Sequence, residues 1–130
     1  MTVSPGQTYL CPIPFFERNS SKVRPAVVIS VCSANAHGDV VVLPIYTNRH
    51  VNSVLAKSTP HNGLKHDSFV RGAPFTISSG RFARHLGHID SASMRRIMDM
   101  LYGLLAPGTP SQPEQTPTLD VEPPSPQVDS

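Results

Sequence analysis

Short apolar runs separated by turn-forming residues fill the first ninety positions of the chain. They predict strands at residues 7–13, 25–32, 39–45, 68–70 and 75–77, with weaker candidates at 51–56 and at 82–89. The runs at 25–32 and 39–45 are rich in β-branched residues, which is typical of buried strands. The polar segment 17–22 has no periodicity and is predicted to be a loop, and Gly87 is expected to break the last candidate strand.

A different periodicity begins at Asp90 and Ser91, which are good N-cap residues for a helix. Behind them apolar residues recur at the three-and-four spacing of one helical face, namely Met94, Ile97, Met98, Leu101, Leu104 and Leu105. Pro107 prevents any continuation. The pattern predicts one amphipathic helix that packs this whole stripe against the core.

Five to seven short strands closed by one helix predict a mainly β fold, a small barrel or curled sheet. A barrel leaves few free strand edges, which favours it for a chain of this length. The predicted domain covers residues 1–106, because the composition changes after that point.

Residues 107–130 hold seven of the 14 prolines and four acidic residues, with no Lys or Arg. Such a segment buries too little apolar surface to offset its ordering entropy, so a disordered acidic tail is predicted. Residues 1–106 then carry 11 basic and five acidic residues, a formal charge of +6. This charge favours a polyanionic partner, and a merely soluble basic surface is the alternative.

Several classes of protein do not fit the sequence. No apolar run approaches the roughly 20 residues that span a membrane, and the first residues do not form a signal peptide, so a cytoplasmic protein is predicted. Cys11 and Cys32 stand alone among apolar neighbours and are expected to be reduced, half-buried thiols. Neither they nor the histidines have the paired spacing of a zinc site. Phosphate-loop, nucleophile-elbow and nicotinamide fingerprints are absent from the sequence.

Four segments in order resemble the MazF/PemK-like toxins, from about Ser4 to Leu105. They are Pro5-Gly6-Gln7 with Pro12-Ile13-Pro14-Phe15, then Lys22 to Ser30, then Gly38 to Ile45, and finally Gly63 to Ile89 with the helix. The most specific piece is Lys22-Val23-Arg24-Pro25-Ala26-Val27-Val28. The resemblance implies an SH3-like barrel with a C-terminal helix, a homodimer, and an RNA groove across two subunits. It also implies sequence-specific cleavage of single-stranded RNA without a metal or cofactor, and inhibition by a cognate antitoxin.

Metal-free RNA cleavage uses the ribose 2′-hydroxyl as nucleophile, so the site must manage its proton and the charge on phosphorus. Arg24 is at the matching position, and a guanidinium suits that charge because its fork binds two phosphate oxygens. The second position that the resemblance implies is a Thr after the third strand, where this chain has Tyr46 followed by Thr47. Thr47 takes the role if the strand slips by one residue; otherwise the Tyr46 hydroxyl donates to phosphate, or its ring stacks on a base.

The proton acceptor of the predicted site does not follow directly from the resemblance. Some family members carry an Arg and an Asp before the stretch that reads Pro74-Phe75-Thr76-Ile77 here, yet this chain has Arg71 without a carboxylate. Histidine titrates in the right range, and His50 is preferred over His61, His66, His85 and His88 because it follows the third strand. Contacts to the RNA backbone are predicted for Arg18, Lys22, Arg49 and Arg71.

Three functions remain open from the sequence. The first is an active endoribonuclease toxin, and the second is a catalytically impaired relative that binds nucleic acid or an antitoxin. The third is a protein-binding toxin, because CcdB-like gyrase poisons resemble the same barrel. Arg24 and the basic body favour RNA over gyrase, whereas Tyr46 and Gly72 favour weakened activity.

Overall fold

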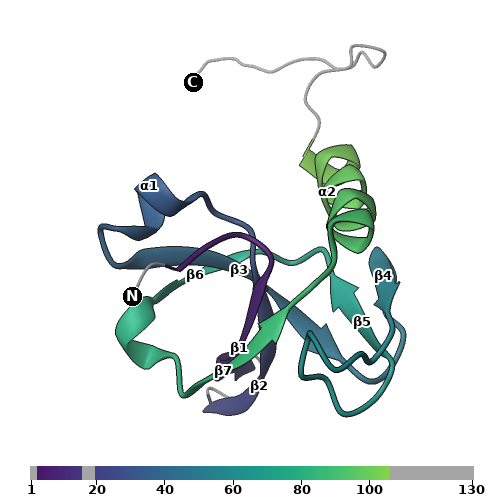
Figure 1. Cartoon of the computed structure of the whole chain (residues 1–130), viewed down its shortest axis with the longest axis horizontal. Helices are drawn as coiled ribbons and strands as arrows, with labels where there is room; N and C mark the ends of the chain where they lie inside the picture. The colour runs from purple at the N-terminus through teal and green to yellow at the C-terminus, as the bar shows by residue number, and fades with distance from the viewer. Residues whose placement is uncertain (1–2, 16–19, 106–130) are drawn as a thin grey trace, which may run out of the picture.

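The structure is a computed structural model that describes residues 3–15 and 20–105 (Figure 1). Its strands are β1 (Gln7–Phe15), β2 (Ser20–Val28), β3 (Asp39–Tyr46), β4 (Ser53–Ala56), β5 (Ser68–Arg71), β6 (Phe75–Ser78) and β7 (Arg84–His88). Its helices are α1 (Cys32–Asn35), the 3₁₀ turn η1 (Ser79–Arg81) and α2 (Ser91–Leu105). The predicted RNA contact Arg18 and the predicted tail 107–130 lie outside the described residues.

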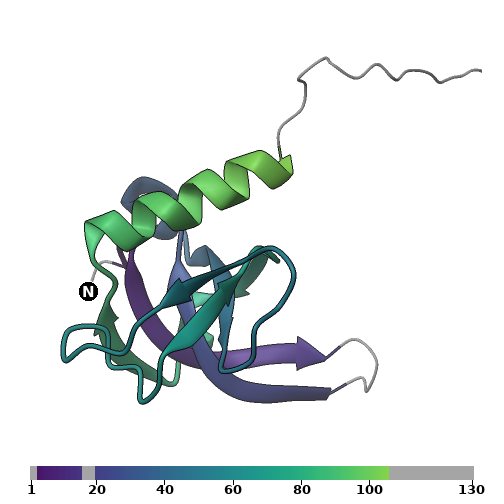
Figure 2. The same cartoon turned by 90° about the vertical axis from the view of Figure 1, so that its right-hand side faces the viewer.

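The strands pair in the order β4-β5-β3-β2-β1-β7, with β6 on the other half of β3, and every pairing is antiparallel. They curl into a half-barrel that α2 crosses on one side, while β1 and β2 run together beneath it (Figure 2). The predicted mainly β fold with a C-terminal helix is therefore confirmed. No helix among the described residues is long and apolar enough to cross a membrane.

The core lies on both sides of β2 and β3, because alternate residues of a strand point to opposite sides. Val27, Leu43 and Ile45 belong to a cluster that also holds Ile97 and Leu101 of α2. The residues between them face a second cluster, which includes Ala26, Val28, Val40, Val42, Tyr9 and Cys11. Since β3 is buried on both sides, its run of apolar residues is continuous. At the end of β3 four consecutive buried residues are followed by Tyr46, which is half-buried.

Two predicted boundaries around the second strand are wrong. The predicted loop 17–22 overlaps β2, which begins at Ser20 because the polar residues there pair with the end of β1. The strand also ends at Val28 and not at Cys32, where α1 begins. The Asn35 side chain closes this turn by donating to the carbonyls of Val3 (2.7 Å) and Ser30 (2.9 Å). Long-range pairing and this amide contact leave no periodic signal in the sequence.

Gly87 was expected to break the last strand, and this expectation is wrong. The residue lies inside β7. A Cβ at this position would overlap the carbonyl oxygen of His61, because the loop between β4 and β5 packs directly on β7. The backbone N–H of His88 donates to the same carbonyl at 2.8 Å. The glycine therefore permits close approach of two backbone segments.

The helix and the cysteines depart from their predicted burial at four positions. Leu104 and Leu105 are 41% and 60% exposed, so the predicted core stripe of α2 ends at Leu101. Cys11 is fully buried and burial raises the pKa of its thiol to about 11, whereas Cys32 is exposed and not half-buried as predicted. Cys11 is thus an inert core residue.

Candidate functional site

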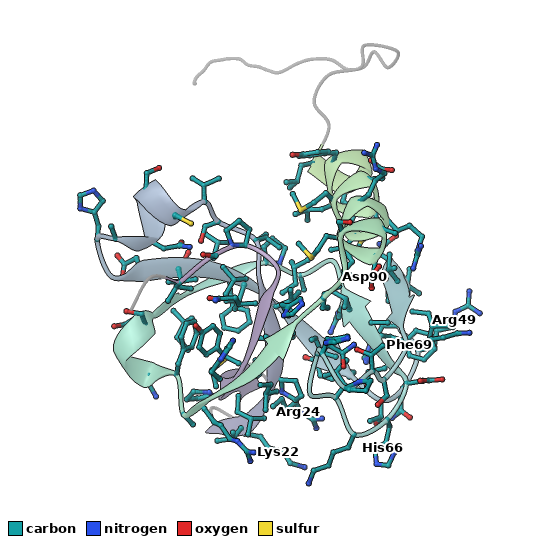
Figure 3. All side chains as sticks on the ribbon, in the orientation of Figure 1. Lys22, Arg24, Arg49, His66, Phe69 and Asp90 are labelled. Carbon is teal, nitrogen blue, oxygen red and sulfur yellow. The ribbon has the colours of Figure 1, made fainter. Side chains whose placement is uncertain are left out.

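Arg24 lies within β2, directly opposite Cys11 of β1. Its side chain is half-buried, and the alternation of the strand places it on the same side as Lys22 and Ala26. Lys22 is exposed one step further toward the end of the hairpin. The two cationic side chains therefore share one side of the sheet, at its end away from α2 (Figure 3).

Tyr46 is the neighbour of Arg24 on the next strand. Ala26 pairs with Pro44, so the same register continued by two residues brings Arg24 opposite Tyr46. The Cζ atom of Arg24 lies 5.3 Å from the centroid of the Tyr46 ring, a cation–π arrangement. The ring thus limits the positions that the guanidinium can adopt.

His50 contacts the same tyrosine from the turn that follows β3. The two ring centroids are 4.5 Å apart, with the rings inclined at 45°. Ser53 at the start of β4 fixes the turn, because its Oγ accepts from the N–H of His50 (3.4 Å) and donates to its carbonyl (2.5 Å). Arg24, Tyr46 and His50 form one group of side chains, called here the Tyr46 cluster.

The other predicted site residues that the structure describes lie on segments next to this cluster. Thr47 is the first residue after β3 and is exposed, and Arg49 is exposed in the same turn (Figure 3). Arg71 ends β5, where it pairs with Ser53, and is also exposed. The structure thus brings together Arg24, Tyr46 and His50, and leaves Thr47 on the open surface.

The remaining candidate proton acceptors have other neighbours. The ring of His61, on the loop between β4 and β5, lies 5.9 Å from the ring of His88 in β7, and the His85 ring lies 4.9 Å from Tyr9. His66 is exposed in the loop before β5. Asp67 accepts from the N–H of Ser58 at 2.8 Å, which ties its carboxylate to that loop. Among these histidines, His50 is therefore the candidate proton acceptor that contacts Tyr46.

Phe69 lies next to the Tyr46 cluster on the neighbouring strand and was not selected from the sequence. It pairs with Tyr46 across β3 and β5 and with Leu55 across β5 and β4. It is half-buried, while Ser68 and Val70 on either side of it are buried. The signal in the sequence was a large aromatic residue between two inward-facing positions of a short strand, but the side on which it faces depends on a register that no local pattern gives.

The structure also bears on a metal and on cavities. Within residues 3–15 and 20–105, no group of three or more His, Cys, Asp or Glu side chains is arranged to hold a metal ion. A surface hollow of about 490 Å³ lies between β4 and the start of α2, lined by residues that include Lys57, Asp90 and Arg96. None of the three residues of the Tyr46 cluster lines this hollow.

The chain matches the family model described as PemK-like, MazF-like toxin of type II toxin-antitoxin systems, over residues 4–105. This chain belongs to that family. The match runs from the segment before β1 to the end of α2 and so contains the Tyr46 cluster. No curated protein matches the sequence significantly.

Solved structures of toxins have the same fold as this MazF-like chain. One is an endoribonuclease of a mycobacterial species in complex with its cognate antitoxin, with a TM-score of 0.66 and 23% identity over 82% of this chain and 98% of that one. MazF of Deinococcus radiodurans gives 0.67 and 17%, over 81% of this chain and 97% of that one. The toxin MazF-mt6 of Mycobacterium tuberculosis gives 0.61 and 18%, over 75% and 93%. At these identities the likeness establishes the fold of the chain.

Proposed function

We propose that this MazF-like chain is a metal-independent endoribonuclease that cleaves single-stranded RNA in the cytoplasm, without a cofactor. We further propose that it acts as a homodimer and is restrained by a cognate antitoxin. Membership of the toxin family supports the class of reaction. The observation that carries the proposal is the half-buried guanidinium of Arg24, held by the Tyr46 ring on the side of the sheet that also presents Lys22.

In the proposed reaction the 2′-oxygen of a ribose attacks the adjacent phosphorus, and the bond from phosphorus to the 5′-oxygen breaks. His50 accepts the proton of the 2′-hydroxyl, and the leaving 5′-oxygen takes a proton from solvent. Arg24 donates to the non-bridging oxygens, on which negative charge accumulates in the transition state. The products are a 2′,3′-cyclic phosphate and a 5′-hydroxyl, so the nucleophile comes from the RNA itself and the step as proposed uses no metal.

From the sequence, Tyr46 was considered as a hydroxyl donor to phosphate or as a ring on which a base stacks. In this proposal it has a different role. Its ring contacts the guanidinium of Arg24 and the imidazole of His50 at the same time. A ring that touches both groups restricts both, and restriction of reacting groups is a large part of catalysis. We therefore assign Tyr46 as a positioning residue that holds the charged group and the base.

A second candidate function is binding of RNA or of an antitoxin without cleavage. Tyr46 stands where the resembled family has a Thr, and Arg71 is followed by Gly72 and not by the carboxylate that some members carry. The cationic side chains of Arg24 and Lys22 would bind RNA or an acidic partner whether or not His50 acts as a base. The same cationic side chains make the gyrase-binding alternative less favourable.

The proposal is tested by incubating the purified chain with diverse single-stranded RNAs in the presence of EDTA. We expect cleavage with 2′,3′-cyclic phosphate ends. Arg24→Ala should lower the rate by about 10²–10³-fold, the range found when one donor to a developing oxyanion is removed. Arg95→Ala, which removes an exposed guanidinium from α2, is the matched control and should cleave normally.

Circular dichroism must show that Arg24→Ala remains folded, because only then does a lower cleavage rate support the catalytic role of Arg24. Full activity of this variant would refute the assignment of Arg24. RNAs left intact by the wild type over long incubation, but still bound, would favour the second candidate function.

A further inference from the structure

We infer that Phe69, with Leu55 beside it, forms a binding subsite for one unpaired nucleobase next to the proposed cleavage site. This inference rests on the proposed function, because it assigns part of the substrate that the Tyr46 cluster would cleave. It concerns a different side chain from those of the cluster, so it can fail while the nuclease assignment stands.

The subsite follows from the register of four neighbouring strands. Arg24 on β2, Tyr46 on β3, Phe69 on β5 and Leu55 on β4 lie in one row across the sheet, with Tyr46 opposite Phe69 and Phe69 opposite Leu55. Residues directly opposite in antiparallel strands point to the same side. The row therefore continues from the guanidinium, through one aromatic ring, to a second ring at an accessible part of the sheet.

Phe69 is better suited than Tyr46 to receive a base. Arg24 and His50 already contact the Tyr46 ring. Phe69 is half-buried, its neighbour Leu55 is 42% exposed, and β4 is the last strand in the order of the sheet. An aromatic ring beside an aliphatic side chain is a surface on which a base can stack without readout of its edge.

Charge around the ring favours RNA as the occupant. Arg71 follows Phe69 by two residues on the same strand and therefore shares its side, and Arg49 is exposed in the turn after Tyr46 (Figure 3). The patch consists of two partly accessible side chains. It is therefore too small to be a specific protein interface by itself, because such an interface buries about 800 Å² on each partner. One flat base between cationic groups matches the patch in size and in charge.

The distance to the proposed cleavage site is also suitable. Two strand spacings separate Arg24 from Phe69, roughly 10 Å at the usual distance between hydrogen-bonded strands. This is within reach of a nucleotide adjacent to the scissile phosphate. A base fixed on Phe69 would set the position of the backbone on Arg24, so the subsite would contribute to binding and to alignment.

The test is a thermodynamic cycle with 2′-O-methyl decamers of uridine and of adenosine, which lack the nucleophile, and an abasic strand of equal length. Phe69→Ala should weaken binding of a base-bearing decamer roughly 10-fold, since stacking of a base on an aromatic ring contributes to the affinity of a single strand. It should leave binding of the abasic strand unchanged. Phe69→Tyr should restore the affinity, and Tyr102→Ala, an exposed aromatic change on α2, should have no effect.

Equal loss for the base-bearing and the abasic strands would overturn the subsite, as would wild-type affinity of Phe69→Ala for both decamers. Unchanged RNA affinity together with a lost self-association, measured by sedimentation, would instead assign the patch to a second copy of the chain. The wild type cleaving RNA while Phe69→Ala binds normally would refute this inference alone. Absence of cleavage by the wild type would refute the proposed nuclease activity. The binding measurements with the 2′-O-methyl decamers would still support or overturn the base-binding subsite.

Discussion

Tyr46 determines how the reacting groups of the proposed site are held. An aromatic ring attracts a guanidinium by roughly 0.5–2 kcal/mol, depending on its exposure. The ring contact to His50 at 4.5 Å restricts the imidazole as well. A single side chain thus orients a cation and a base that come from different segments of the chain.

Tyr46→Phe retains the ring and should keep a cleavage rate close to that of the wild type. Tyr46→Leu removes both ring contacts, and we expect kcat to fall about 10-fold, the change that a lost cation–π contact of this strength predicts, with KM less affected. The ring protons of His50 should also lose the upfield NMR shift that a neighbouring aromatic ring causes. Inactivity of Tyr46→Phe would show instead that the hydroxyl takes part in the reaction.

The sequence was informative about single residues only where their chemistry was local. Arg24 and His50 were selected by residue type and by position relative to a strand, and their placement beside Tyr46 makes them the core of the proposed site. Phe69 was overlooked because its importance arises from pairing with Tyr46 across 23 positions of sequence. The choice between Tyr46 and Thr47 likewise depended on where β3 ends.

At the scale of elements, α2 was predicted well because its signals are contiguous. Asp90 caps the helix, and its Oδ2 accepts from the N–H of Ser93 at 2.9 Å. This hydrogen bond holds the pKa of the Asp90 carboxyl below its ordinary value. The strand β2 was predicted less well, since its first residues are polar and pair with the end of β1.

Asp90→Ala should lower the free energy of unfolding by about 1 kcal/mol at pH 7, the usual effect of removing an N-cap. Because the carboxyl pKa is lowered on folding, the added stability is present above the unfolded value near pH 4 and is lost as the pH falls through the folded value. Urea denaturation should therefore show a difference between the variant and the wild type that shrinks toward pH 3. Asp90→Asn should retain most of the cap, and Asp99→Ala, on the exposed side of α2, should change little. An undiminished difference at pH 3 would contradict this account.

At the scale of the molecule, basic and acidic residues are distributed unevenly along the sequence. Residues 1–106 carry a formal charge of +6, and residues 107–130 carry four acids and no basic residue. Composition was enough to predict a polyanionic partner, but it could not say which side of the half-barrel would bind it. The structure supplies that side as a hypothesis, because Lys22, Arg24 and Arg71 all lie beside or within the row that leads from β2 to β4.

Lys22 provides a test of this placement that does not depend on cleavage. Each phosphate contact to a single strand releases about 0.7 of a counterion, so the logarithm of affinity falls with the logarithm of salt by that amount for each contact. Lys22→Ala should reduce the slope for the 2′-O-methyl decamers by about 0.7 and weaken uridine and adenosine strands equally. Arg95→Ala removes an equal charge from α2 and should leave the slope unchanged. An equal decrease of the salt slope in both variants would mean that RNA affinity depends only on net charge. It would contradict the assignment of the RNA-binding surface to the side of the sheet that carries the Tyr46 cluster.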